Sequence, residues 1–153
     1  HLASGVVADN TPSFGVRLSG NQSIANGSPT KIAWNVEDWD SDNAFASNKF
    51  TVASGKAGKY QFSGVVIMRN IDANELCSIR IHVNGSDSAS GINHYRFNGM
   101  GTGSDTFVNC PISVVLNLSV NDYVEVFVYH NEGASQNVDA GYSRWSGFKL
   151  AGV

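Results

Sequence analysis

The sequence predicts an all-β protein: a sandwich of two sheets with ten strands. Apolar and polar residues alternate over short runs, and no stretch places its apolar residues at the spacing of a helix. Clusters of Gly, Asn, Ser and Asp separate the runs, and 16 glycines in 153 residues suit a chain with many turns. About ten strands of this length are typical of two packed sheets.

Turn-forming residues separate the predicted strands. Asn84-Gly85 is a hairpin signal that follows an apolar strand, and two long loops, 36–47 and 131–142, are expected to carry specificity. The predicted strands are 12–18, 31–36, 48–53, 58–69, 75–84, 92–98, 105–108, 111–119, 122–130 and 143–150.

The length and composition predict one domain, and we expect it to span 12–153. The small polar residues of 1–11 are expected to be a linker, with His1 left by an expression tag. A net charge of −3 without a run of Lys or Arg argues against nucleic acid as a partner. No apolar run approaches the ~20 residues that cross a bilayer, so we expect no membrane insertion.

The two cysteines, Cys77 and Cys110, do not form a CxxC zinc pattern. They leave two interpretations open, a disulfide between them or a reduced, buried Cys77, and the second is the simpler.

The run 58–69 has two different halves. Tyr60 and Phe62 alternate with Gln61 and Ser63, but from Val65 onward both sides of the strand are apolar. Its second side must therefore be covered, either by another copy of the chain or by a loop or N-terminal arm of the same copy.

Four motifs in order resemble the C1q-like jelly roll, the domain shared by complement C1q and the tumour necrosis factor superfamily. They are GKYQF at 58–62, HVNG at 82–85, LNLSVNDYVEVFV at 116–128 and WSGFKL at 145–150, within a match that covers 12–150. Asn121 stands where the family usually has Gly, and Asn tolerates a left-handed turn. The resemblance implies a jelly roll that assembles as a homotrimer.

The resemblance also implies which sheet face packs around the threefold axis. The residues expected at that interface are Gln61, Ser63, Val65, Ile67, Ser113, Val115, Asn117, Trp145 and Lys149. Alternation predicts that the opposite sides of the strands form the core, with Tyr60, Phe62, Val66, Val124, Val126, Val128, Phe148 and Leu150.

Two sets of residues are candidates for a site. Asp38, Asp40 and Asp42 supply alternate oxygen ligands of the kind Ca²⁺ prefers, although the segment is not an EF-hand and a solvated acidic loop is the simpler interpretation. The second set, aromatic rings beside hydrogen-bonding groups, suits a sugar or peptide ligand: Tyr123, Phe127, Tyr129, Arg80 and His82, with His94 and Arg96 one strand further. The alternative there is ordinary cross-strand pairing, including an Arg80–Glu125 ion pair.

No arrangement of catalytic residues is recognisable, so we expect a binding or structural module rather than an enzyme, with no required cofactor and at most Ca²⁺. The low charge and polar loops resemble C1q-like domains of bacteriophage virions, which implies a fibre tip or capsid decoration that binds a host-surface glycan or other virion proteins. The alternatives are a secreted lectin-like recognition protein and a polysaccharide hydrolase.

Overall fold

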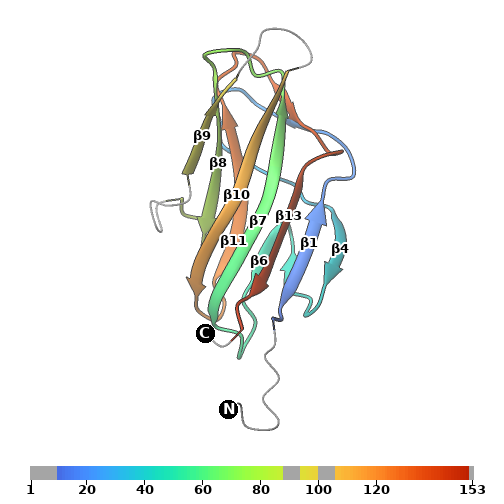
Figure 1. The fold of residues 1–153 in the computed structure, drawn as a ribbon, viewed down its shortest axis with the longest axis vertical. Coiled ribbons are helices and arrows are strands. Elements are labelled where there is room, and N and C mark those ends of the chain that lie inside the picture. The colour runs from blue at the N-terminus through green and yellow to red at the C-terminus, as the bar shows by residue number, and fades with distance from the viewer. Residues whose placement is uncertain (1–9, 88–93, 100–105, 152–153) are drawn as a thin grey trace.

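The computed structural model describes residues 10–87, 94–99 and 106–151, which form a sandwich of two antiparallel sheets (Figure 1). These residues contain thirteen strands and no helix, and therefore no helix that could span a membrane. The strands are β1 (Ser13–Arg17), β2 (Gln22–Ile24), β3 (Thr30–Lys31), β4 (Val36–Asp40), β5 (Phe45–Ala46), β6 (Lys49–Thr51), β7 (Gly58–Arg69), β8 (Leu76–Val83), β9 (His94–Asn98), β10 (Phe107–Leu118), β11 (Tyr123–His130), β12 (Gln136–Val138) and β13 (Arg144–Lys149).

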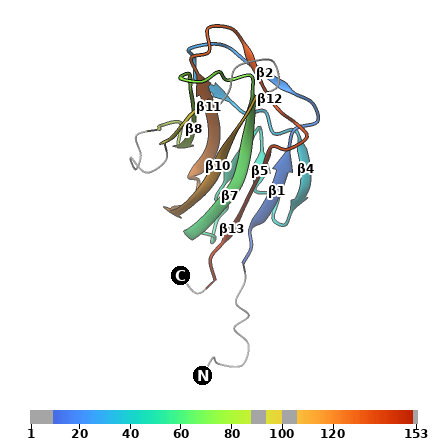
Figure 2. The ribbon, with the colours of Figure 1, turned by 45° about the horizontal axis from the view of Figure 1, so that its top comes forward.

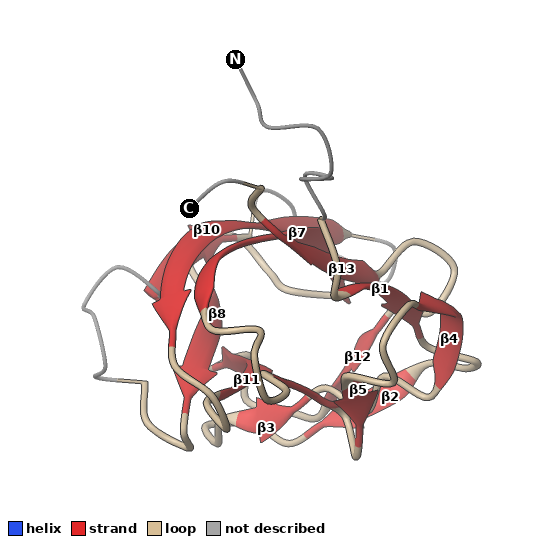
Figure 3. Cartoon of the chain, turned by 90° about the horizontal axis from the view of Figure 1, so that it is seen from below, coloured by secondary structure: helices blue, strands red, loops and turns tan. Residues whose placement is uncertain are grey.

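One sheet has seven strands in the order β2-β12-β7-β13-β1-β4, with β10 paired to the other edge of β7. The second has six strands in the order β5-β6-β11-β8-β9, with β3 also paired to β11. Seen from below, β10, β7, β13 and β1 form one layer, and β8, β11 and β3 the other (Figure 3). β2 and β12 lie at the far end of the sandwich from the point where the chain enters β1 (Figure 2).

The prediction of an all-β two-sheet sandwich is confirmed, but the number of strands differs. Predicted strands 105–108 and 111–119 are one strand, β10, which tolerates Pro111 because no described strand pairs with its outer edge. The predicted turn at Asn84-Gly85 is present, with φ of 54° and 78°. The predicted strand 31–36 and the predicted loop 36–47 are wrong at their junction, because residues 32–35 form no strand and 36–40 form β4. The short strands β2, β5 and β12 were also not predicted, because two or three residues are too few to show alternation.

Aromatic side chains from both sheets fill the core. Phe14 stacks against Phe45 and Phe50, each with ring centroids 5.2 Å apart. Trp145 meets Phe14 edge-on at 4.8 Å and lies 5.9 Å from Phe62. Each of these rings is at most 5% exposed, and such burial contributes on the order of 1.5–3 kcal/mol for each large side chain.

The predicted sides of the last strand are reversed. Trp145 was expected at the trimer interface and Phe148 in the core, but Trp145 is 1% exposed and Phe148 is 38% exposed. The register explains the reversal, because Trp145 lies opposite Gly64, which faces inward between Phe62 and Val66. Lys149 lies opposite Tyr60, so it also belongs to the inward side, at the half-buried end of β13.

The two cysteines join the sheets without a covalent bond. Cys77 of β8 and Cys110 of β10 are free and fully buried, and their sulfur atoms are 3.3 Å apart. A disulfide would require about 2.05 Å. The hydrogen bond to Cys77, together with burial, raises the pKa of the Cys110 thiol, so this group stays protonated.

Gly147→Ala should destabilise the fold. Its Cβ would lie 2.6 Å from Cδ1 of Phe62 and 2.9 Å from Cε1 of Phe14, and neither packed ring can move without disturbing the core. We expect a loss of about 1–3 kcal/mol in the free energy of unfolding, measured with urea. Gly20→Ala is the control, because no atom lies within 4 Å of the added Cβ. Equal stability of the two variants would contradict this packing.

Both thiols should be protected in the folded chain and reactive in the unfolded one. We expect Ellman's reagent to react slowly with the native protein, because both sulfur atoms are buried. In concentrated guanidinium it should detect two thiols per chain. Detection of none under that condition would show that the pair is a disulfide.

Candidate binding site

The outer face of the six-stranded sheet brings together the five residues that the sequence assigns to a ligand surface. His82 lies opposite Glu125, and Arg80 lies opposite Phe127. The inward side chains between them, such as Val126, are fully buried, so these residues face outward. We call this surface the β8–β11 face, formed by Arg80, His82, Tyr123, Glu125, Phe127 and Tyr129, with Lys31 of β3 and Lys49 of β6.

Each aromatic ring on the β8–β11 face is covered on one side by a side chain that carries nitrogen. The rings of His82 and Phe127 are stacked, with centroids 4.0 Å apart and planes at 15°. The other two contacts are cation–π pairs, Arg80 with Tyr129 at 5.2 Å and Lys49 with Tyr123 at 4.2 Å from the ring centroid.

The ion pairs on this face differ from the one expected. Glu125 is 8% exposed and accepts a hydrogen bond from Lys31 Nζ at 3.0 Å. Arg80 does not pair with Glu125, because it lies opposite Phe127 and its Nη1 is 3.5 Å from Asp87 Oδ2. The expected Arg80–Glu125 ion pair is therefore absent: Glu125 pairs with Lys31 of the neighbouring strand β3, and Arg80 pairs with Asp87 in the turn that follows β8.

Two nitrogen atoms of the β8–β11 face are buried and have no hydrogen-bond partner among the described residues, His82 Nε2 and Arg80 Nε. Burial lowers the pKa of His82, and Arg80 lowers it further, although the charges of Asp87 and Glu125 oppose this. His82 is therefore neutral at pH 7. Since the Nε of arginine always carries a proton, Arg80 presents an unsatisfied donor.

The register of β9 agrees with the expectation for the next strand. His94 pairs with Arg80, and Arg96 pairs with Ser78.

The three aspartates of the candidate calcium site, Asp38, Asp40 and Asp42, are not brought together. No group of three His, Cys, Asp or Glu side chains in the described part of the chain lies close enough to hold a metal ion. Their partners, in the same order, are the Arg17 guanidinium at 2.9 Å, the amides of Ala44 and Phe45 at 3.0 and 2.9 Å, and the Lys56 ammonium at 3.2 Å. Calcium binding stays a prediction, and it would require Asp38 and Asp42 to leave these cations.

The outer face of the seven-stranded sheet carries rows of small and apolar residues. We call it the β7–β13 face, with the rows Val115, Gln61, Phe148; Ser113, Ser63, Ser146; and Pro111, Val65, Arg144. Val115 is 51% exposed and Phe148 is 38% exposed. Of the predicted interface residues, Gln61, Ser63, Val65, Ser113, Val115 and Asn117 lie on this side of the sheet.

At Ile67 the chain covers its own sheet. Ile67 is 6% exposed, its amide donates to Ser143 Oγ at 3.0 Å, and its carbonyl accepts from the Asp139 amide at 2.8 Å. These bonds fix the loop between β12 and β13 along the edge of β7, and Ile67 is buried within one copy of the chain, as the alternative of internal covering expects, whereas Val65 is only half-buried. A groove of about 540 Å³ remains beside it, lined by Val65, Ile67, Phe107, Asn109 and Tyr142.

The position of this loop depends on a buried charge. Asp139 is 2% exposed and accepts a hydrogen bond from Arg69 Nε at 2.5 Å, and the Arg69 guanidinium lies 4.8 Å from the ring centroid of Phe107. Sequence reasoning did not single out Asp139, Phe107 or Tyr142. Because Arg69 and Asp139 are 70 positions apart, no local pattern identifies the pair.

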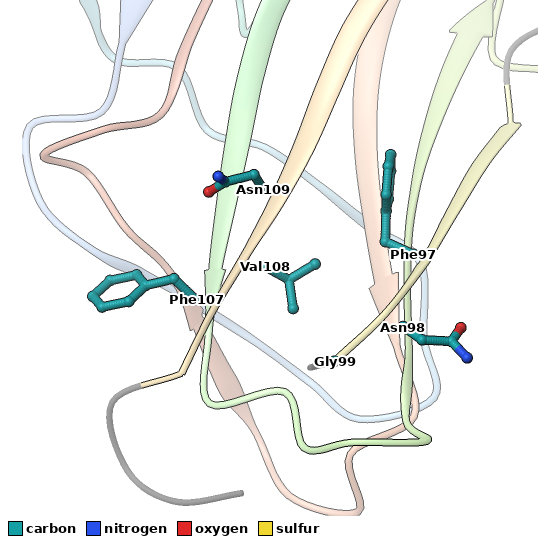
Figure 4. Close-up of a pocket in the computed structure, with 6 residues that line it drawn as sticks. All are labelled: Phe97, Asn98, Gly99, Phe107, Val108 and Asn109. Atoms are coloured by element: carbon teal, nitrogen blue, oxygen red, sulfur yellow. The ribbon is translucent and has the colours of Figure 1, made fainter. Parts of the chain in front are cut away.

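A second cavity of about 470 Å³ lies between the end of β9 and the start of β10 (Figure 4). Val108 projects to one side of β10 and Phe107 to the other. The described residues that line it carry no ionisable group; they are Phe97, Asn98, Gly99, Phe107, Val108 and Asn109.

Comparison with known proteins identifies the fold. No family model matches the chain, and no curated protein sequence is similar enough to match it. Among solved structures, the globular domain of the zebrafish complement 1qA protein superposes with a TM-score of 0.59 at 17% identity, covering 91% of this chain and 97% of that one. Murine APRIL at pH 8.0 gives a TM-score of 0.60 at 13% identity, covering 90% and 98%, and its pH 5.0 structure gives 0.57. The predicted jelly-roll fold, of the kind found in C1q and in tumour necrosis factor-like proteins, is therefore confirmed.

Proposed function

From a jelly-roll fold similar to those of C1q and APRIL, we propose that this chain is a homotrimeric recognition module and not an enzyme. Three copies pack their β7–β13 faces around a threefold axis and turn their β8–β11 faces outward. The observation that supports this is the set of exposed apolar side chains on the β7–β13 face: Val115 and Phe148 lie in one row on either side of Gln61, and the exposed Phe107 lies at the other end of β10. Apolar side chains grouped on one sheet face are typical of an interaction surface.

The proposed ligand is a glycan on a cell surface, and the proposed mechanism is multivalent binding. Each β8–β11 face is shallow, so a single copy binds weakly. Three copies on one rigid trimer raise the effective concentration of the second and third sites, which increases avidity by about 10²–10⁴ without new contacts.

The proposed location is the surface of a virion, as a fibre tip or a capsid decoration that also contacts other virion proteins. A secreted lectin-like protein is the alternative. Virion genes beside the coding sequence would support the first, and a collagen-like or coiled-coil segment upstream in the same reading frame would support the second. We do not propose a hydrolase, because the carboxylates of Asp38, Asp40 and Asp42 already bind separate groups of the chain.

The trimer can be tested by light scattering after size exclusion. The wild-type protein at low micromolar concentration should have three times the 16.3 kDa mass of the chain. Val115→Lys should give a monomer, because three ammonium groups would meet near the axis. Val120→Lys is the matched control, since Val120 is exposed in a turn outside the β7–β13 face and should leave the mass unchanged. A monomeric wild-type protein would refute the assembly.

Recognition can be tested on a glycan array with the same two variants. We expect the wild-type trimer and Val120→Lys to be retained, and the Val115→Lys monomer to lose avidity by about a hundredfold or more. Retention that does not depend on the assembly state would contradict multivalent binding. Absence of retention of the wild-type trimer on every glycan would contradict recognition of a saccharide.

A further inference from the structure

An exposed tryptophan, Trp39, lies on β4 at one edge of the seven-stranded sheet. Its side chain is 52% exposed, and it pairs with Gly15 of β1. Because Phe14 and Val16 on either side of Gly15 are buried in the core, Trp39 lies on the outer side of the sheet. A Cβ on Gly15 would lie 2.3 Å from two ring atoms of Trp39, so the indole packs against the backbone of β1. The rest of the indole is open to a partner.

The groove of about 540 Å³ beside the loop between β12 and β13 opens on the same side of the sheet, at β10 and β7. β13 and β1 lie between these two strands and β4 (Figure 1). Trp39 therefore cannot reach the groove of its own copy. Phe107 is 46% exposed and Tyr142 is 64% exposed, so the aromatic side chains that line the groove are also open to a partner.

The symmetry of a trimer requires two different surfaces of this kind. In a ring of three identical chains, each contact joins one surface of a copy to a different surface of the next copy. A projecting apolar side chain at one edge and an apolar groove at the other satisfy this requirement, and three such contacts close the ring. Tryptophan is among the residues whose burial contributes most to the stability of protein interfaces.

The groove also suits an indole in size and in hydrogen bonding. Its volume lies within the roughly 300–1,000 Å³ of pockets that enclose a small ligand, and it is lined mainly by apolar side chains. A buried indole N–H needs an acceptor. Asn109, which lines the groove, carries an amide oxygen that can accept this hydrogen bond.

The charges beside the two surfaces are opposite in sign. Glu37 is exposed two positions before Trp39, and Arg144 is exposed opposite Val65, which lines the groove. Neither Glu37 nor Arg144 forms an ion pair within the described part of the chain. Opposite charges on two surfaces favour their association and set its register.

We propose that Trp39 of each copy inserts into the groove of the next copy, between Phe107 and Tyr142, and that Glu37 then faces Arg144 across the interface. This inference rests on the proposed function, because it names the contact that closes the proposed trimer. It also gives a role to the exposed part of the acidic segment around Trp39.

Chemical cross-linking tests the contact directly. Glu37→Cys combined with Arg144→Cys keeps the indole and the groove, and a short bis-maleimide should link its copies into covalent trimers on a denaturing gel. Glu37→Cys combined with Val120→Cys is the matched control, since Val120 is exposed in a turn outside both surfaces and should give no linked species. The native cysteines are buried and do not react in the folded chain.

Substitutions at the contact test its contribution to stability. Trp39→Ala should raise the midpoint concentration of trimer dissociation by about tenfold or more, measured by light scattering over a dilution series. Val120→Ala is the control and should leave the midpoint unchanged, because Val120 lies outside both surfaces. Circular dichroism of each variant establishes that the chain is folded.

A charge exchange tests the register. Glu37→Arg and Arg144→Glu should each raise the dissociation midpoint by about threefold or more, because each places like charges across the interface. The variant that carries both substitutions should recover most of the loss. Such recovery cannot come from a folding defect. Additive losses in the double variant would overturn the pairing of Glu37 with Arg144.

The outcomes separate this inference from the proposed function. A wild-type trimer whose Glu37→Cys/Arg144→Cys variant gives no linked species would overturn the inference and leave the trimer intact. An unchanged midpoint in Trp39→Ala, or equal cross-linking in the Val120→Cys control, would overturn it as well. A monomeric wild-type protein would instead refute the proposed function, and the inference with it.

Discussion

The pairing of Trp145 with Gly64 determines how the seven-stranded sheet presents its outer face. Glycine lets β13 approach β7 closely at this point, because a Cβ on Gly64 would lie 2.2 Å from the carbonyl oxygen of Arg144, and the indole of the neighbouring Trp145 is buried between the sheets. Once Trp145 points inward, the pleat of β13 turns Arg144, Ser146 and Phe148 outward, beside the matching residues of β7. The chemistry of one entire surface thus follows from the side of the strand on which a single aromatic residue is buried.

The two sheets differ in what they leave exposed, although both contribute to the same core. The β7–β13 face carries three serines and separate apolar side chains, with Gln61 and Arg144 among them, and its short side chains suit close contact with another protein surface. The β8–β11 face carries long cationic side chains laid over aromatic rings. Its strands pair along most of their length, so a rigid backbone holds the stacked His82 and Phe127 in position before any ligand arrives.

Much of this arrangement is visible in the sequence wherever a strand is long and alternates regularly. β7 has its predicted bounds, and Arg80, His82 and Phe127 lie on the predicted side of their sheet, because four or more alternating positions fix which side is buried. Lys31 and Lys49 of the β8–β11 face were not predicted, because β3 and β6 have only two and three residues. The buried side of β13 could not be predicted in this way. Trp145 and Phe148 are both large and apolar but lie on opposite sides of the strand, so the sequence pattern does not show which of them is buried. The contacts of the acidic residues 38–42 and of the groove at Tyr142 could not be predicted for another reason. Lys56, which pairs with Asp42, and Arg69, which pairs with Asp139, are distant from their partners in the sequence.

The amide of Lys149 donates to the carbonyl of Pro12, which places the entry to β1 and the exit from β13 side by side at one pole of the sandwich (Figure 1). Any shaft or scaffold joined to the domain through either position would attach at that pole. In an assembly with threefold symmetry along the strands, three such attachments converge on one base. The turns between β7 and β8 and between β11 and β12 lie at the opposite pole, so an attachment at the base leaves these turns and the outer faces of both sheets uncovered.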